Sequence, residues 1–107
     1  MTWTVVSLDK RVDDELDALP PDIQARYVRI AEMISDYGLE RVREPYVKHL
    51  DGKLWEIRMK GKDGIARAIY VAASGKRVVV LRAFTKKTQK TPKRELDIAR
   101  QRLQEVL

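Results

Sequence analysis

Basic and polar side chains crowd into a short stretch near the end of the chain. Residues 84–92 read Phe-Thr-Lys-Lys-Thr-Gln-Lys-Thr-Pro, directly after the apolar run from Val78 to Leu81. A strand-to-helix connection usually needs only a few residues. This one carries enough donors to bind phosphates, and Phe84 offers a ring on which a nucleobase could stack. Together with Arg58 and Arg67 upstream, the stretch points to RNA as a partner.

The chemistry that suits these residues is cleavage of RNA by its own 2′-hydroxyl. One group takes the 2′ proton, cations hold the developing negative charge, and another group protonates the departing 5′ oxygen. Arginine binds a phosphate through two parallel hydrogen bonds. A lysine becomes a base when cationic neighbours lower its pKa, and Lys87 would have Arg58 and Arg67 as such neighbours. Binding without chemistry fits the same spacing. The candidate set is Arg58, Arg67, Lys86, Lys87 and Gln89, with Phe84 beside them.

Other basic and aromatic residues have more ambiguous roles. Lys48 and Lys53 flank an Asp-Gly turn, where they would either extend the basic surface or be solvated. His49, the single histidine, is more typical of a surface or packing residue than of a catalyst. Phe84 fits a core position as well as a stacking platform. The aromatic Trp55 lies among apolar neighbours on a predicted strand, so we expect it in the core.

The elements that must position these residues follow from the hydrophobic periodicity. Amphipathic helices are predicted over 9–19 and 22–37, with Asp22 as a cap, Gly38 as a stop, and a proline turn between the helices. Alternation and turn residues predict strands over 3–8, 54–59, 65–73 and 77–85, and the three later strands should pair antiparallel. A last helix should start with Thr91 as its cap. The order β-α-α-β-β-β-α gives an α+β domain, an antiparallel sheet with a helical hairpin on one face.

The sheet also predicts where the arginines lie. Arg58 and Arg67 fall on neighbouring strands, and the apolar Ile65, Ile69 and Val71 share the face of Arg67. We expect the last helix to cover part of that face and to leave the arginine end as a groove.

Charge and composition limit the class of protein. The chain of 107 residues carries a net charge of +6 and suits a single domain, residues 1–107. Counting Lys and Arg against Asp and Glu gives −4 for residues 1–45 (6 against 10), +3 for 46–75 (6 against 3) and +7 for 76–107 (10 against 3). Such asymmetry favours a polyanionic partner. Absent cysteine and one histidine argue against thiolate chemistry and a metal site, and nothing resembles a signal peptide or membrane span. We expect a cytoplasmic protein without cofactor, metal or membrane partner.

Several short motifs in this order resemble a known family. They are Leu54-Trp55-Glu56-Ile57-Arg58, Ala66-Arg67-Ala68-Ile69-Tyr70, Val79 to Phe84, Lys86-Lys87 and Gln89 to Pro92, followed by a helix with Ala99 and Arg102. The chain resembles the HigB-type, phage-derived branch of the RelE/ParE toxins of type II toxin–antitoxin systems, over nearly its whole length.

The resemblance implies a RelE-like fold and a ribosome-dependent mRNA endonuclease, an mRNA interferase that cuts without metal. It also implies a cognate helix-turn-helix antitoxin and operator DNA bound only through the antitoxin complex. By position, Arg58 and Arg67 would hold the scissile phosphate and Lys87 would be the basic residue after the last strand. By position the resemblance also covers Phe84 and Lys86. The full set of candidate RNA contacts is Lys48, Lys53, Arg82, Phe84, Lys86 and Gln89.

Two other functions remain open at this point. The ParE branch shares the fold but poisons DNA gyrase and cuts no RNA, although the strand arginines and the dibasic loop favour RNA cleavage. A non-catalytic RNA- or DNA-binding module would also account for the basic second half of the chain.

Overall fold

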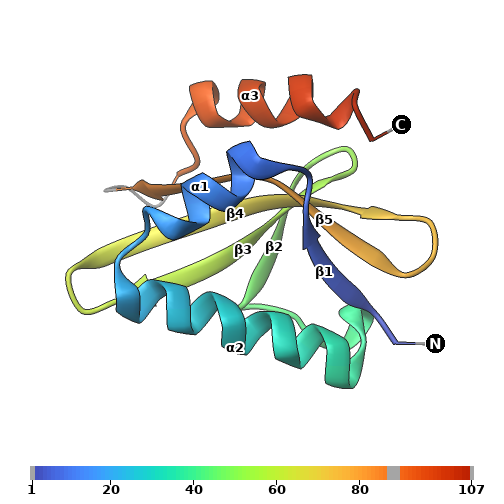
Figure 1. The fold of residues 1–107 in the computed structure, drawn as a ribbon, viewed down its shortest axis with the longest axis horizontal. Coiled ribbons are helices and arrows are strands. Elements are labelled where there is room, and N and C mark those ends of the chain that lie inside the picture. Colours follow the sequence, from blue (N-terminus) through green and yellow to red (C-terminus); the bar gives the residue numbers. More distant parts are fainter. Residues whose placement is uncertain (1, 87–89, 107) are drawn as a thin grey trace.

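A five-stranded sheet separates two helical layers in the computed structural model, which describes residues 2–86 and 90–106 (Figure 1). The strand order is β1-β5-β4-β3-β2, and every neighbouring pair is antiparallel except β1 and β5, which are parallel. The α+β prediction is confirmed. The elements are β1 Thr4–Ser7, α1 Lys10–Asp17, α2 Pro21–Tyr37, a 3-10 turn Leu39–Arg41, β2 Val47–Asp51, β3 Leu54–Gly61, β4 Gly64–Ala73, β5 Arg77–Lys86 and α3 Lys93–Leu103.

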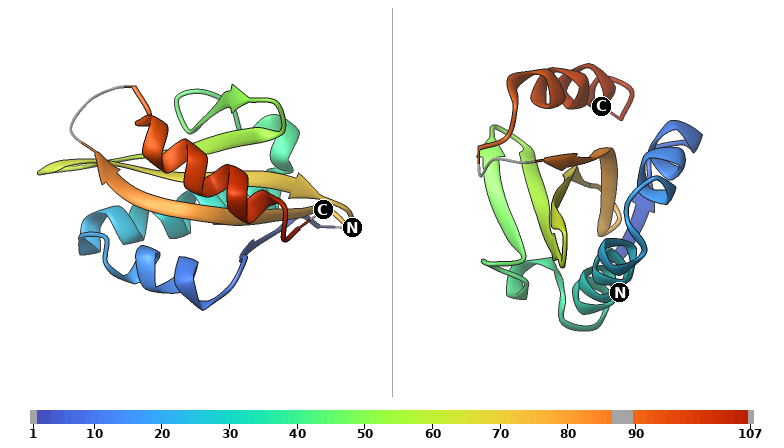
Figure 2. Two further views of the ribbon diagram at one scale, coloured as in Figure 1. Left: turned by 90° about the horizontal axis from the view of Figure 1, so that it is seen from above. Right: turned by 90° about the vertical axis from the view of Figure 1, so that its left-hand side faces the viewer.

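Helices α1 and α2 cover one face of the sheet and α3 lies over the other (Figure 2). The period-3.6 stripe of α2, with Ile23, Ile30 and Ile34, packs against the sheet residues Ile57 and Tyr70 in the larger core. A smaller core under α3 contains Ile69, Val71, Val79, Leu81, Phe84 and Ala99. Alternation along each strand therefore sends side chains into two separate cores.

The structure differs from the predicted elements at the sheet edges. Residues Val47–Asp51 form an unpredicted edge strand, β2, next to β3. Its sequence, with two charged residues, His49 and a single β-branched Val47, carries a weak strand signal, and its pairing with β3 supplies the regular structure. The first strand pairs in parallel with β5, a contact between segments far apart in sequence that turn residues cannot reveal.

Both predicted side-chain caps are wrong. Helix α2 starts after Pro20, and the Asp22 carboxylate accepts the backbone N–H of Lys62, in the β3–β4 turn, at 2.8 Å. Helix α3 starts after Pro92 and has no side-chain cap, because the Thr91 hydroxyl bonds elsewhere. Gly38 does end α2, with φ 90° and its N–H bonded to the carbonyl of Ile34.

Candidate functional site

The strand register brings the two predicted arginines together. Arg58 on β3 lies opposite Arg67 on β4, which lies opposite Phe84 on β5. Directly opposite residues of antiparallel strands project from the same face, here the face of the smaller core under α3. Lys86 lies two residues beyond Phe84, on the same face. The sheet therefore places Arg58, Arg67 and Lys86 close to one another on the face that α3 covers.

A buried carboxylate lies among these cations. Glu56 is 2% exposed, and its Oε2 lies 3.3 Å from Nε of Arg67 and 3.7 Å from Nε of Arg58. The Thr91 hydroxyl donates to its Oε1 at 2.7 Å. Sequence reasoning gave Glu56 no role. Its alternation with Arg58 on the polar side of β3 could have indicated that the two residues share a face. The contact with Thr91 spans 35 positions and cannot be predicted from the sequence.

We call Glu56, Arg58, Arg67 and Lys86 the charged cluster. Arg67 is 3% exposed, and burial lowers the pKa of its guanidinium. Although Nε of Arg67 is in ion-pair contact with Glu56, it has no hydrogen-bond partner among the described residues. A buried N–H of this kind is costly unless something accepts it, so the cluster is suited to a further anionic acceptor.

Lys86 has the environment that sequence reasoning assigned to Lys87. It is 7% exposed, and burial, followed by the charge of Arg67, lowers the pKa of its ammonium group. A lysine with a lowered pKa is a better proton acceptor near neutral pH than a solvated one. Lys87 and Gln89 lie outside the described residues, so their predicted roles stay predictions.

The other predicted RNA contacts fall in three different surroundings. Lys48 on β2 lies opposite Glu56 and adds to the positive field at Lys86. Lys53 lies in the β2–β3 turn, on a different groove. Phe84 is 8% exposed and packs in the core under α3, which leaves little ring surface for stacking a base.

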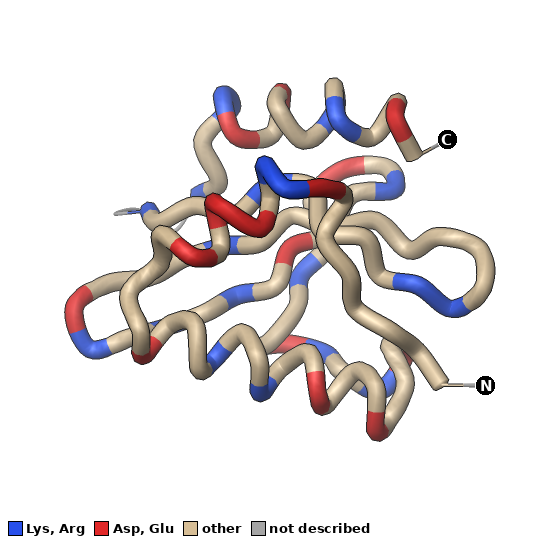
Figure 3. The backbone as a smooth tube through the Cα atoms, viewed as in Figure 1, with Lys and Arg blue, Asp and Glu red and all other residues tan. Residues whose placement is uncertain are grey.

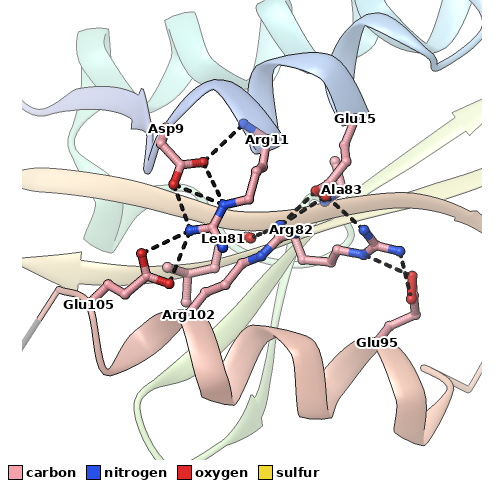
Figure 4. Close-up of polar contacts among 9 residues, drawn as sticks. All are labelled: Asp9, Arg11, Glu15, Leu81, Arg82, Ala83, Glu95, Arg102 and Glu105. Atoms are coloured by element: carbon pink, nitrogen blue, oxygen red, sulfur yellow. Dashed lines mark hydrogen bonds and ion pairs between the residues drawn. The ribbon is translucent and has the colours of Figure 1, made fainter.

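Arg82 lies in an ion-pair network instead of on an open surface (Figure 4). Its guanidinium contacts Glu15 of α1 at 2.7 Å and Glu95 of α3 at 3.1 Å. Arg102 of α3 also reaches Glu15, at 2.9 Å. These contacts join α1, β5 and α3. The acidic run on α1, prominent in Figure 3, therefore includes one residue, Glu15, that faces the protein.

Among the grooves formed by the described residues, two contain predicted site residues. One, of about 680 Å³, is lined by Lys86 and Phe84 together with the start of α3, and Arg58 and Arg67 are not among its lining residues. This groove therefore differs from the expected one, because it contains Lys86 but neither arginine. The other, of about 1020 Å³, includes His49, Lys53 and Trp55. Trp55 is 39% exposed, against the core position expected for it. His49 lies edge-on to Trp55, with ring centroids 4.9 Å apart, and its Nε2 is 2.8 Å from the Gly52 carbonyl.

Among residues 2–86 and 90–106, no group of three or more His, Cys, Asp or Glu side chains is arranged to hold a metal ion. Over the same described part of the chain, no helix is long and apolar enough to cross a membrane.

The fold is that of a RelE-like protein. The chain is similar to RelE in the crystal structure of the archaeal RelE–RelB complex from Pyrococcus horikoshii OT3, with a TM-score of 0.58, 23% identity, and coverage of 84% of this chain and 100% of that one. No curated protein matches the chain.

The sequence itself gives the family. Residues 14–104 match the family described as phage derived protein Gp49-like (DUF891), and the chain belongs to it. The predicted resemblance to phage-derived toxins of the RelE superfamily is thereby confirmed.

Proposed function

We propose that this protein is the toxin of a type II toxin–antitoxin system and acts as a ribosome-dependent mRNA endonuclease. The observation that carries the proposal is the direct pairing of Arg58 with Arg67 next to the buried Lys86. Membership of the Gp49-like family and the RelE-like fold support the toxin assignment. The partner RelB named with the similar RelE structure supports a cognate antitoxin; a helix-turn-helix type is our expectation.

The reaction needs no atom beyond the RNA and the protein. The 2′ oxygen attacks the adjacent phosphorus, Lys86 accepts the 2′ proton, and the P–O5′ bond breaks as the 5′ oxygen takes up a proton. The products are a 2′,3′-cyclic phosphate and a 5′-hydroxyl. Arg58 and Arg67 stabilise the negative charge that develops on the phosphate oxygens, which is the main electrostatic contribution in such sites. Lys87 is the proposed proton donor to the 5′ oxygen.

Induced expression in a bacterial host tests the function. We expect growth arrest, and primer extension should show new mRNA ends inside translated codons. Arg58→Gln should abolish both effects, because the cluster loses a phosphate-binding cation at a partly exposed position. Arg29→Gln, an equal charge change on the exposed side of α2, is the matched control and should remain toxic. Arg67→Ala is a poorer test, since it leaves buried Glu56 without its nearest cation.

Two outcomes would overturn the assignment. Intact mRNAs together with gyrase-dependent DNA breaks would indicate a gyrase poison of the same fold. Unaffected growth on expression, with the protein folded and present, would indicate a nucleic-acid-binding module without catalysis.

A further inference from the structure

Glu56 is an unusual residue to find in a site built for a phosphate. Glu56 is 2% exposed, and its carboxylate lies within 3.7 Å of both arginines that would hold the substrate. A carboxylate repels a phosphate, and a buried ion pair adds little net stability, because desolvation offsets most of its Coulomb energy. Neither substrate attraction nor folding stability by itself explains a glutamate at this position.

The contacts of Glu56 join three segments of the site. Oε2 faces the guanidinium groups of Arg58 and Arg67, while Oε1 accepts the hydroxyl of Thr91 at 2.7 Å. Thr91 directly precedes the turn that starts α3. The Glu56 side chain thus contacts the arginines of β3 and β4 and also holds Thr91, just before α3, beside them.

We propose that Glu56 is a positioning residue that holds Arg58 and Arg67 for the scissile phosphate and offsets one positive charge, so that the cluster favours the transition state over the bound substrate. The proposal deepens the endonuclease function above and rests on it.

The charges of the cluster match those of the reaction. With Lys86 neutral and ready to accept a proton, two arginines and one carboxylate leave a charge of +1 (2 − 1), opposite one negative charge on the phosphodiester. After proton transfer Lys86 is charged, the cluster carries +2, and the pentacoordinate phosphorus carries two negative charges. Binding that strengthens only as charge develops accelerates the reaction, whereas tighter binding of the ground state does not.

Glu56→Gln tests this directly, because glutamine keeps the shape and an acceptor for Thr91 but removes the charge. A 2′-fluoro RNA cannot be cut, so ribosomes programmed with it report binding of the protein alone. We expect Glu56→Gln to bind them about fivefold tighter than the wild type, since a negative charge that repels the phosphate is lost. Single-turnover cleavage of the 2′-hydroxyl RNA should fall about 100-fold, the usual effect of misplaced groups. Glu32→Gln removes an equal charge from the exposed face of α2 and should change neither quantity.

The pH profile gives an independent readout. Glu56 raises the pKa of Lys86, so Glu56→Gln should move the alkaline rise of the cleavage rate to lower pH. Glu56→Asp keeps the charge and should restore wild-type RNA affinity and pH profile with part of the rate. The charged groups that act on Lys86 are Arg67 on β4, Glu56 and Arg58 on β3 and Lys48 on β2, and its groove is also lined by Asp22, Asp63, Arg94 and Glu95.

The outcomes separate this inference from the proposed function. An unchanged cleavage rate in Glu56→Gln, or weaker RNA binding together with a lower thermal midpoint, would overturn the positioning role. If the wild type binds RNA but never cuts it, the endonuclease function fails. Affinity then decides the inference: tighter binding by Glu56→Gln supports the role of Glu56 in offsetting charge, and unchanged binding overturns it.

Discussion

At the scale of single residues, Lys86 is the group whose surroundings most alter its chemistry. Burial and the charge of Arg67 lower its pKa from the ordinary 10.5. If Lys86 accepts the 2′ proton, the single-turnover rate should rise with pH and level off below 10.5, once the amine is mostly neutral. Lys86→Met should lower the rate about 10²–10⁴-fold and remove this rise. Lys62→Met, at an exposed turn position, should leave the profile intact.

The same lowered pKa makes folding stability depend on pH. A lysine with a lower pKa in the folded than in the unfolded state binds fewer protons when folded, so stability rises with pH between the two values. The wild type should therefore gain free energy of unfolding relative to Lys86→Met as the pH rises from neutral toward 10.5. Urea unfolding of both proteins at several pH values measures the difference in free energy of unfolding. A difference that stays constant or falls with pH would contradict a lowered pKa of Lys86 in the folded state.

At the scale of elements, the Glu15 network fixes the positions of α1 and α3 around β5. Glu15 binds Arg82 and Arg102 at 2.7 and 2.9 Å and accepts the N–H of Ala83 at 3.1 Å, all in partly buried surroundings. Glu15→Gln should lower the free energy of unfolding by about 2–3 kcal/mol, because hydrogen bonds to a charged group are lost in a shielded site. Asp14→Asn removes an exposed pair with Lys10 on the same helix and should cost at most about 0.5 kcal/mol. Urea titration compares the two variants, and equal losses would show that the network contributes no more than a surface pair.

The elements also show what sequence could and could not predict. Alternation on β3 and β4 placed Arg58 beside Arg67, because hairpin turns keep consecutive strands paired. Glu56 and Lys86 were not assigned their roles, because their surroundings come from Thr91 and Arg67, distant in sequence. Arg82 looked available for RNA, but its two glutamate partners lie 67 and 13 positions away. Periodicity thus predicts which face of a helix or strand a residue occupies, whereas the residues it contacts on neighbouring elements depend on tertiary packing.

At the scale of the whole molecule, positive and negative charge are concentrated in different parts of the chain. Residues 46–107 carry 16 Lys and Arg against 6 Asp and Glu, or +10, while residues 1–45 carry −4. The negative part includes α1 and α2, which cover the sheet face opposite α3 (Figure 2). Asp22, at the start of α2, also lines the groove of Lys86. RNA should therefore bind from the side of α3 and β3, where its phosphates meet the cations of the charged cluster.

This arrangement predicts a strong dependence of RNA binding on salt. If about four phosphates are neutralised, the logarithm of the binding constant should fall with a slope of about −2.8 against the logarithm of salt concentration, as for single strands. Affinity for the 2′-fluoro RNA would then drop about 50-fold between 50 and 200 mM salt. Fluorescence anisotropy measures the slope. Arg58→Gln should lower its magnitude by about 0.7, one phosphate contact, whereas Arg29→Gln on the acidic side should leave it unchanged. Equal slopes for both variants would place the RNA on another surface of the molecule.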